Sequence, residues 1–376
     1  MLYWLLYGPE GPLLDVPGIW LLKFISFRAA AAAVTAFLLA LTLGRIVIPR
    51  LAMAGMREST DKSPAELLRE LHAGKQGTPT MGGTFLIGSL LISGAVWLRF
   101  DRFNDYSWIA LFTIAWFAAV GFADDWIKLR TERKGLRGRI KQRLLTAGAL
   151  LSGLALVWMG LGGDDGPSLW LPFTTEPLVE FGTGWLGVAG FALLAVLVLT
   201  GSANAVNLTD GMDGLATGCV LTASLAYCGI SYFVGNSELA SYLRVEHVPG
   251  AGEMVVLLAG LIGACFGFLW FNAAPALVFM GDVGSLALGG ALGFVALVSR
   301  TEFALVVVGG IFVAEAVSVI LQVVSFRLFG GRRIFRCAPL HHHFEYGKMP
   351  ETRVVVRFWI VSAMLALCSL ALFKVR

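Results

Sequence analysis

The sequence predicts an all-α integral membrane protein that crosses the bilayer about ten times. Hydrophobic residues make up 57% of the chain and charged residues only 14%, whereas about a quarter of the residues in a soluble globular domain are charged. The apolar residues are gathered into long runs, and roughly 20 mostly apolar residues are enough for a helix to cross the hydrocarbon core. Residues 1–376 are therefore expected to form one transmembrane domain.

Ten apolar runs are long enough to form such helices. The stretch from Met1 to Pro17 has no basic start and no small-residue cleavage site, so we expect retained chain and not a signal peptide. The five cysteines show no metal-binding or redox spacing, and four of them lie in or beside apolar runs, so small membrane-buried hydrophobes are expected. The spans are predicted at 20–48, 81–99, 106–123, 144–162, 184–201, 214–234, 254–271, 284–299, 303–326 and 354–373.

The distribution of charge predicts which connections face the cytoplasm. Lys and Arg are concentrated in 124–143 and 327–353, whereas the loop after the fourth span has four acidic residues and no Lys or Arg. Basic residues tend to stay on the cytoplasmic side, and an even number of spans leaves both termini on the other, periplasmic side. The net charge of +4 is small for a nucleic-acid-binding protein, and the basic residues lie next to the spans, where they suit anionic lipid. No nucleic-acid partner is therefore expected. The cytoplasmic connections are then 49–80, 124–143, 202–213, 272–283 and 327–353.

Nearly every unusual polar cluster falls in one of these connections, which is typical of an enzyme working at one membrane face. Asp124 and Asp125 end the third span, and Lys128 follows one helical turn later. Two adjacent carboxylates at a membrane boundary are costly to desolvate unless they hold a cation or titrate. The alternative is a solvated helix end with an ion pair.

The next polar cluster follows the fifth span. Asn207, Asp210 and Asp213 stand among glycines there. Their oxygens suit hard cations or ribose and uracil groups, and the missing Glu at the twelfth loop position argues against an EF-hand. A plain turn would also explain the Asn and Gly residues.

The third inner connection carries Asn272, Phe279, Gly281 and Asp282 directly before a span. An Asp flanked by glycines is a plausible metal ligand, and the amides of the following helix N-terminus suit a phosphate. A turn or N-cap aspartate is the alternative. The segment 75–83 adds a cation at Lys75 and hydroxyls such as Thr80, without the order of a Walker A loop.

The last inner connection contains His341, His342 and His343 in a row, after Ala338. Consecutive side chains do not easily face one tetrahedral zinc site. Phosphate contact or proton transfer fits them better. Together with the carboxylates and Gly-rich turns, they indicate Mg²⁺ and a pyrophosphate substrate. A transporter is the competing class, with Glu315 in the ninth span as its best candidate residue. Glu315 and Gln322, which lies two turns further on, could instead line the wall of the catalytic cleft.

These motifs resemble those of the polyprenyl-phosphate N-acetylhexosamine-1-phosphate transferases. The resemblance runs over the whole chain and is carried by 75–83, 124–128, 207–214, 279–285 and 338–345. It implies ten transmembrane helices, a homodimer in the bacterial inner membrane, and a Mg²⁺-dependent active site in a cleft that opens to the cytoplasm. The motif at 338–345 separates this kind of member from relatives that transfer other sugars, which are the main alternative within the family.

The resemblance also implies substrates. The donor would be UDP-N-acetylmuramoyl-pentapeptide and the acceptor undecaprenyl phosphate. The products would be UMP and undecaprenyl-pyrophosphoryl-N-acetylmuramoyl-pentapeptide (lipid I), an intermediate of peptidoglycan. Nucleoside natural products would act as inhibitors. A one-step transfer and a covalent two-step mechanism both stay open at this point.

Residue roles follow from the same resemblance. Asp282 would bind Mg²⁺, with Asp124 and Asp125 beside it as candidate catalytic groups. His341 and His342 would contact phosphate or sugar. The residues implied for the uridine and inhibitor pocket are Asn207, Asp210, Asp213 and Phe279, with Gln322 and Ala338 near it. The other substrate-binding candidates are Lys75, Thr80, Lys128, Asn272, Gly281 and His343.

Overall fold

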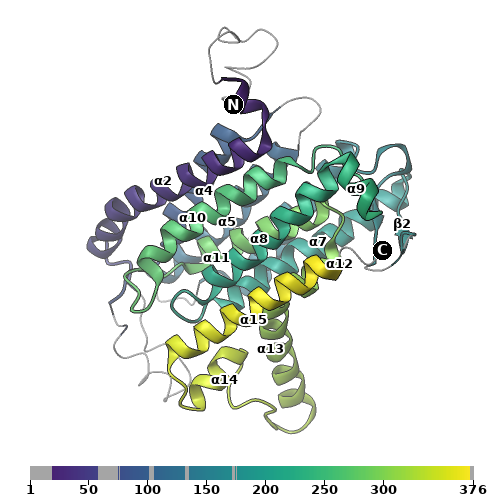
Figure 1. The fold of residues 1–376 in the computed structure, drawn as a ribbon. Coiled ribbons are helices and arrows are strands. Elements are labelled where there is room, and N and C mark those ends of the chain that lie inside the picture. The colour runs from purple at the N-terminus through teal and green to yellow at the C-terminus, as the bar shows by residue number, and fades with distance from the viewer. Residues whose placement is uncertain are drawn as a thin grey trace.

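The computed structural model describes a bundle of long helices that run side by side (Figure 1). The described residues are 19–57, 75, 77–100, 106–131, 135–171, 174 and 176–372. Within them the only sheet is one antiparallel pair of two-residue strands, β1 (Ser168–Leu169) and β2 (Val179–Glu180). The expected all-α architecture is confirmed.

Nine of the described helices are long and apolar enough to cross a membrane, and α4 is a shorter apolar helix of 15 residues, about 22 Å long. Each predicted span overlaps one of these ten helices, so the chain is a multi-pass membrane protein. The long helices are α2 (Ile25–Met53), α5 (Tyr106–Arg130), α6 (Gly138–Trp158), α7 (Trp185–Thr209), α8 (Leu215–Gly235), α10 (Glu253–Asn272), α11 (Gly281–Val298), α13 (Gly310–Leu328) and α15 (Glu351–Leu372). The short ones are η1 (Ile19–Lys23), α4 (Gly83–Trp97), η4 (Gly163–Asp165), α9 (Ser237–Leu243), α12 (Glu302–Val308) and α14 (Leu340–Tyr346).

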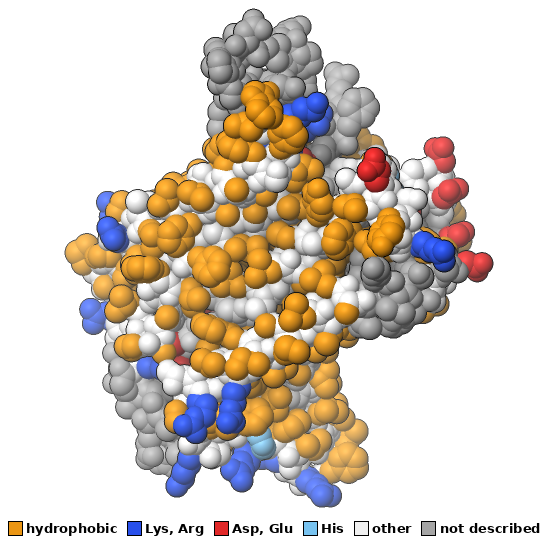
Figure 2. Space-filling model, in the orientation of Figure 1, with side chains coloured by type: hydrophobic (Ala, Val, Ile, Leu, Met, Phe, Trp, Pro, Cys, Tyr) orange, Lys and Arg blue, Asp and Glu red, His pale blue; other side chains and the backbone are white. Residues whose placement is uncertain are grey.

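Helix α11 forms the centre of the bundle. It packs against α4, α5, α7 and α8, and 89% of the residues in its apolar stretch are buried inside the protein. A helix that is hydrophobic all round is typical of such a position. The outer helices α2 and α13 are only 22% and 28% buried. Their exposed apolar side chains contribute to the hydrophobic surface that Figure 2 shows over the middle of the molecule, and this surface suits lipid.

The helices extend further at their polar ends than the apolar runs do. The predicted spans 106–123 and 184–201 stop short of Arg130 and Thr209, where α5 and α7 end. The span expected from residue 284 begins at Gly281. Hydropathy stops where charged and polar residues begin, but backbone hydrogen bonding continues through them. Asp124, Asp125, Asn207 and Asp282, which were expected in connections, therefore lie on helix ends, whereas Asp210 and Asp213 lie in the turn between α7 and α8.

The ninth predicted span, 303–326, is not one straight helix. It divides into α12 and α13 at Gly309, and α13 leaves the bundle at an angle (Figure 1). A Cβ atom added to Gly310 would lie 2.8 Å from Leu365 on α15. Glycine pairs are a known cause of helix breaks, and here they also allow close contact with α15.

The two ends of the molecule differ in charge. Lys and Arg side chains gather at the end where α14 lies, whereas most of the visible Asp and Glu side chains lie at the opposite end near β2 (Figure 2). This separation is the three-dimensional form of the loop-charge bias in the sequence, and it distinguishes the two membrane faces.

Candidate active site

Three aspartates from two helices converge at the basic end of the bundle. Asp124 and Asp125 lie in α5, and Asp282 lies in the first turn of α11. One carboxylate oxygen from each lies within 4.8 Å of the other two. The first two side chains are buried and the third is largely buried. The structure thus unites two clusters that are 154 residues or more apart in the sequence.

Two lysines neutralise much of this negative charge. The Nζ atom of Lys128 lies 2.6 Å from Asp124 Oδ2 and 2.8 Å from Asp282 Oδ2. Lys141, in the second turn of α6, places its Nζ 2.6 Å from the same oxygen of Asp282. Sequence reasoning missed Lys141, because nothing distinguishes it from the other basic residues of its connection. Three carboxylates and two ammonium groups form one compact network.

Neighbouring groups fix the orientation of each carboxylate. Asn207 of α7 donates from Nδ2 to Asp282 Oδ1 at 2.9 Å and to Ser285 Oγ at 2.8 Å. The backbone N–H of Leu136 donates to Asp124 Oδ1 at 2.7 Å. The positive end of the α11 dipole also favours an anion at Asp282. Charge-assisted bonds of this kind are stronger than neutral ones, so the acids are held in defined positions.

Glycines set the spacing of the helices that carry the acids. A Cβ atom on Gly121 of α5 would lie 2.2 Å from the carbonyl oxygen of Asp282. A Cβ on Gly83 of α4 would lie 2.2 Å from the backbone nitrogen of Gly284. Gly281 has φ +74, and its Cβ would lie 2.5 Å from Asp125. The three helices therefore touch through their backbones at the site.

A second charged centre lies around Lys75. Its Nζ donates to Asp213 Oδ1 at 2.7 Å and to Glu351 Oε1 at 2.5 Å. Burial opposes the charge on Lys75, but hydrogen bonds and attraction to these two carboxylates outweigh it and raise the pKa above its usual value. Lys75 is therefore a permanent cation at neutral pH. Its ring-face contact with Phe279, at 6.0 Å from Nζ to the centroid, brings a third predicted residue to this centre.

Two other candidates support the backbone of this centre. Asn272 is buried, accepts from the Gly214 N–H at 3.0 Å and donates to the Val278 carbonyl at 2.9 Å. Its side chain therefore fixes two loops. The backbone N–H of Thr80 donates to the Met56 carbonyl at 3.0 Å, and the next residues pair with the segment before α11. Within the described part of the chain, the hydroxyl of Thr80 makes no hydrogen bond with the acids.

The three histidines have different partners. His341 is buried, and its Nδ1 lies 3.1 Å from Glu315 Oε1. Glu315 also accepts the backbone N–H groups of Leu340 at 2.5 Å and His341 at 3.1 Å. His342 lies 3.0 Å from Glu345 through Nδ1. His343 Nδ1 accepts the N–H of Arg336 at 3.1 Å.

The other nitrogen of His341 faces the turn after α7. Its Nε2 is buried and has no hydrogen-bond partner among the described residues. A Cβ on Gly211 would lie 2.2 Å from it. The segment 207–214 therefore touches all three centres: Asn207 meets the acids, Gly211 meets His341, and Asp213 meets Lys75.

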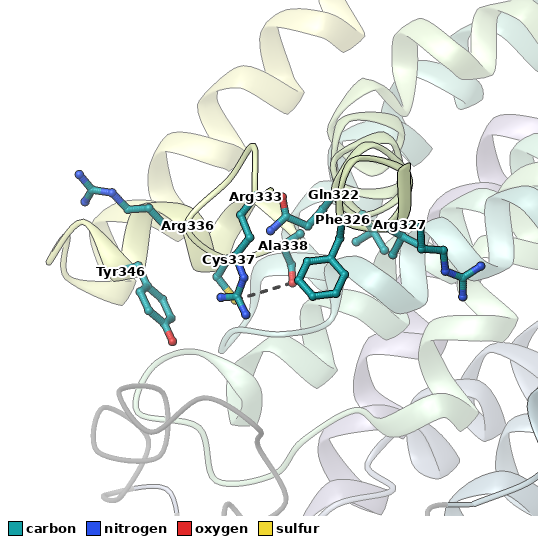
Figure 3. A pocket seen from close by; sticks show the side chains of 10 residues that line it. Gln322, Phe326, Arg327, Arg333, Arg336, Cys337, Ala338 and Tyr346 are labelled. Carbon is teal, nitrogen blue, oxygen red and sulfur yellow. Dashed lines mark hydrogen bonds between the residues drawn. The ribbon is translucent and has the colours of Figure 1, made fainter. Parts of the chain in front are cut away.

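Gln322 holds the polypeptide beside the site. Its Nε2 donates to the Phe335 carbonyl at 3.0 Å, and its Oε1 accepts the N–H groups of Ile334 and Phe335 at 3.0 Å. Gln322 and Ala338 line a cavity of about 540 Å³ next to α13 (Figure 3). Both predicted residues thus line the same cavity, but the side-chain amide of Gln322 is already hydrogen-bonded to the backbone of Ile334 and Phe335.

The acid cluster has the chemistry of a metal site. Carboxylate oxygens are the donors that hard divalent cations prefer. Among the described residues, Asp124, Asp125 and Asp282 are the one group of His, Cys, Asp or Glu side chains close enough together to share an ion. Lys128 and Lys141 already place positive charge beside the same oxygens. The cluster can therefore hold a metal ion.

Comparison with known proteins identifies relatives along the entire chain. The family model described as glycosyl transferase family 4 matches residues 107–300, which include the three aspartates. A phospho-N-acetylmuramoyl-pentapeptide-transferase of Thermodesulfovibrio yellowstonii is 44% identical over 380 residues, covering 100% of both chains.

Proteins of the same name from two further bacteria agree with this. The protein from Desulfosudis oleivorans is 42% identical and the one from Desulfovibrio desulfuricans 44%, each over 94% of this chain and 95% of the relative. With this similarity, and with the aspartate cluster inside the matched region, the chain belongs to glycosyl transferase family 4, among the phospho-N-acetylmuramoyl-pentapeptide-transferases.

Proposed function

We propose that this protein transfers phospho-N-acetylmuramoyl-pentapeptide from its UDP carrier to undecaprenyl phosphate, which yields lipid I and UMP. One observation carries the proposal: three aspartates and two lysines form a single network at helix ends, in a chain similar over its full length to transferases of that name. Membrane-embedded charge of this kind is costly and is typical of functional sites.

The chemistry explains why such a network is needed. An oxygen of the lipid phosphate attacks the phosphorus that bears the sugar, and the bond to the UMP oxygen breaks. Both reactants are anions, so transfer depends on reducing their repulsion and stabilising charge in the transition state. Mg²⁺ held by Asp282, with Asp124 and Asp125, would supply positive charge to the pyrophosphate. Lys128 and Lys141 supply further charge from the protein itself.

The acceptor needs little help from a base. A phosphate monoester has a second pKa of about 6, so it is largely a dianion at neutral pH. Asp124 and Asp125 then act mainly by holding cations and lysines in place. We assign His341 to phosphate or sugar contact through Nε2, because Glu315 occupies its other nitrogen.

The uridine end is proposed at the Lys75 centre. Phe279 offers an aromatic face there, and Asp210 lies in the adjoining turn. Asp213 is held by Lys75 and by the Ala276 N–H at 3.0 Å, so its role is to support the pocket. Nucleoside inhibitors would compete at this position. We also propose that the protein works as a homodimer in the bacterial inner membrane.

We propose that the site opens to the cytoplasm, where UDP-linked sugars occur. Single cysteines in a cysteine-free background test this. Arg139 and Asp165 are exposed and lie at the basic and acidic ends respectively. A cysteine at 139 should react with an impermeant thiol reagent only in opened cells, and one at 165 should react in intact spheroplasts. Lys134, another possible label site, lies outside the described residues, and Ser168 is buried.

The decisive experiment is an assay with purified protein. UMP should be released only when UDP-N-acetylmuramoyl-pentapeptide, undecaprenyl phosphate and Mg²⁺ are all present, and EDTA should stop the reaction. UDP-N-acetylglucosamine should not replace the donor. UMP release with that sugar instead would point to a relative with a different substrate. No transfer from either donor would contradict the enzymatic proposal.

A further inference from the structure

The first residue of the last helix is a carboxylate that reaches back to the Lys75 centre. Glu351 begins α15 and lies 138 residues after Asp213 in the sequence. Its Oε1 accepts from Lys75 Nζ at 2.5 Å and from the Asp213 N–H at 2.9 Å. One oxygen atom therefore joins the side chain of Lys75 to the backbone of the turn between α7 and α8.

The simplest explanation for an acid in the first turn of a helix is local. Such a carboxylate commonly interacts with the free N–H groups and the positive dipole end of its own helix. Glu351 instead contacts groups of two other segments. The side chains of Lys75 and Glu351 are only 20% and 19% exposed, so solvent screens this pair less than it screens a surface ion pair. Both observations favour a role outside α15.

The position of the Lys75 ammonium group depends on its carboxylate partners. A lysine has a flexible four-carbon stem, and ordering such a side chain costs conformational entropy. Asp213 Oδ1 lies 2.7 Å from Nζ on one element, and Glu351 Oε1 lies 2.5 Å from it on another. Two partners on different elements hold the ammonium group in one place, whereas a single ion pair would still allow the stem to rotate.

A second side chain of α15 binds the same turn. Trp359, about two helical turns after Glu351, donates from Nε1 to the Gly214 carbonyl at 3.3 Å. A Cβ atom on Gly218 of α8 would lie 2.0 Å from that nitrogen, so α15 and α8 are in close contact. Glu351 therefore projects from a helix whose place relative to the turn is already fixed.

We propose that Glu351 is a positioning residue for the donor, which holds the Lys75 ammonium group at the nucleotide end of the site. The inference rests on the proposed function, which places uridine at the Lys75 centre. The acceptor phosphate is assigned to the acid cluster, where Lys128 and Lys141 supply the positive charge. Loss of the Glu351 charge should therefore weaken binding of the donor and leave kcat and the acceptor KM unchanged.

A purely electrostatic role predicts the opposite sign. Lys75 lies between two carboxylates, so this centre carries one excess negative charge. Removing that charge would strengthen binding of an anionic donor if long-range repulsion dominated. Repulsion of this kind is screened by salt, whereas loss of a direct contact moves Lys75 itself. We therefore expect weaker binding at physiological salt.

The test compares Glu351→Gln with a matched control. Glutamine keeps an oxygen that can accept the Asp213 N–H, but it lacks the charge that holds Lys75. Glu238→Gln makes the same change in the first turn of α9, at an exposed position. Steady-state UMP release gives kcat and the KM of each substrate. Equilibrium dialysis with UDP-N-acetylmuramoyl-pentapeptide gives the donor Kd.

Glu351→Gln should raise the donor Kd and KM about tenfold, which corresponds to about 1.4 kcal/mol, and should change kcat and the acceptor KM less than twofold. Glu238→Gln should change none of these values. In a Lys75→Met background, Glu351→Gln should change the donor Kd less than twofold, because a residue that acts through Lys75 then has nothing to position. Such non-additivity is the signature of coupled residues.

A chemical measurement on the free protein reports on the same contact without catalysis. Burial opposes the charge on Lys75, and Glu351 is one of the two carboxylates that outweigh burial. An amine-specific acylating reagent should therefore modify Lys75 severalfold faster in Glu351→Gln, as read by peptide mass spectrometry. Lys23, which is exposed, is the internal reference. An acid that served only its own helix would leave the rate at Lys75 unchanged.

Unchanged donor binding and unchanged labelling in folded Glu351→Gln would overturn the inference. Tighter donor binding would overturn it as well, and so would an equal loss with and without Lys75. If Glu351→Gln is unfolded, Glu351→Asp, which keeps the charge but withdraws it by one methylene, should show the same donor-specific loss. Absence of UMP release from the wild-type protein would count against the proposed function instead, while the labelling rate still reports on Lys75 and Glu351.

Discussion

Replacing Asp282 by asparagine keeps the side-chain shape and removes the charge that both lysines share. Oδ2 of Asp282 accepts from Lys128 at 2.8 Å and from Lys141 at 2.6 Å. A hydrogen bond to a charged group contributes about 1.5–3 kcal/mol and a neutral one about 0.5–1.5 kcal/mol. In the variant, each lysine donates to an uncharged amide oxygen, so each of the two contacts loses about 1–1.5 kcal/mol. The two losses together amount to roughly 2–3 kcal/mol. At about 1.4 kcal/mol per factor of ten, turnover should fall about 10²-fold.

This estimate agrees with the about 10²–10³-fold loss seen when one preorganised electrostatic contributor is removed. The assay is UMP release at saturating donor, acceptor and Mg²⁺, with Asp165→Asn in the exposed outer loop as the matched control. The control should keep normal turnover. Thermal unfolding in detergent should show that both variants are folded. Near-normal turnover of folded Asp282→Asn would refute the assignment of this carboxylate to the catalytic centre.

Three further predictions concern residues around and away from this centre. Lys141→Met should lower turnover about 10- to 100-fold, because it removes a charge-assisted hydrogen bond of about 1.5–3 kcal/mol; unchanged UMP release would show that Lys128 suffices. Glu315→Gln should lower turnover about tenfold or more, because an amide cannot accept from two backbone N–H groups and the ring of His341 at once; nitrogen-15 NMR should report a changed tautomer of His341, and an unchanged spectrum with full activity would contradict this. Glu253→Gln should destabilise the protein by about 3–5 kcal/mol, because it breaks a buried bidentate pair with Arg28; thermal unfolding measures it, and an unchanged Tm would show that the pair contributes nothing.

Much of the fold could be predicted from hydropathy, because burial in lipid or in the core of the bundle requires long apolar runs. The ends could not. The apolar run at 106–123 stops before Asp124, yet α5 continues through this residue to Arg130. The carboxylate of Asp124 is stabilised there by ion pairs with Lys128 and Lys141 and by the Leu136 N–H. The helix break at Gly309 was also not predicted. A glycine within an apolar run does not reveal which distant side chain packs closely against it.

The candidate site was predictable where residue type and membrane side were enough. Asp124 and Asp282 were expected on one face, and the structure brings them together. Lys141 was not found, because the direction of one lysine in a basic segment depends on where α6 begins. Glu315 was considered as a transport residue or as part of the wall of the catalytic cleft, but its pairing with His341 was not predicted, because the two residues are 26 positions apart and no local pattern joins them.

The backbone contacts at Gly83 and Gly121 bear on how this chain tolerates mutation. Neither residue has a side chain, charge or ligand, yet each spaces the helices that carry the acids. Even alanine would have to displace α11 at these positions and so change the distance between carboxylates on different helices. In a random mutagenesis screen for loss of growth, substitutions at Gly83 and Gly121 should therefore be recovered as often as substitutions of the aspartates. Conversely, inhibitor-resistant variants that retain enzymatic activity should be absent at these two glycines. They should arise instead at positions where a new side chain fits without moving a helix backbone.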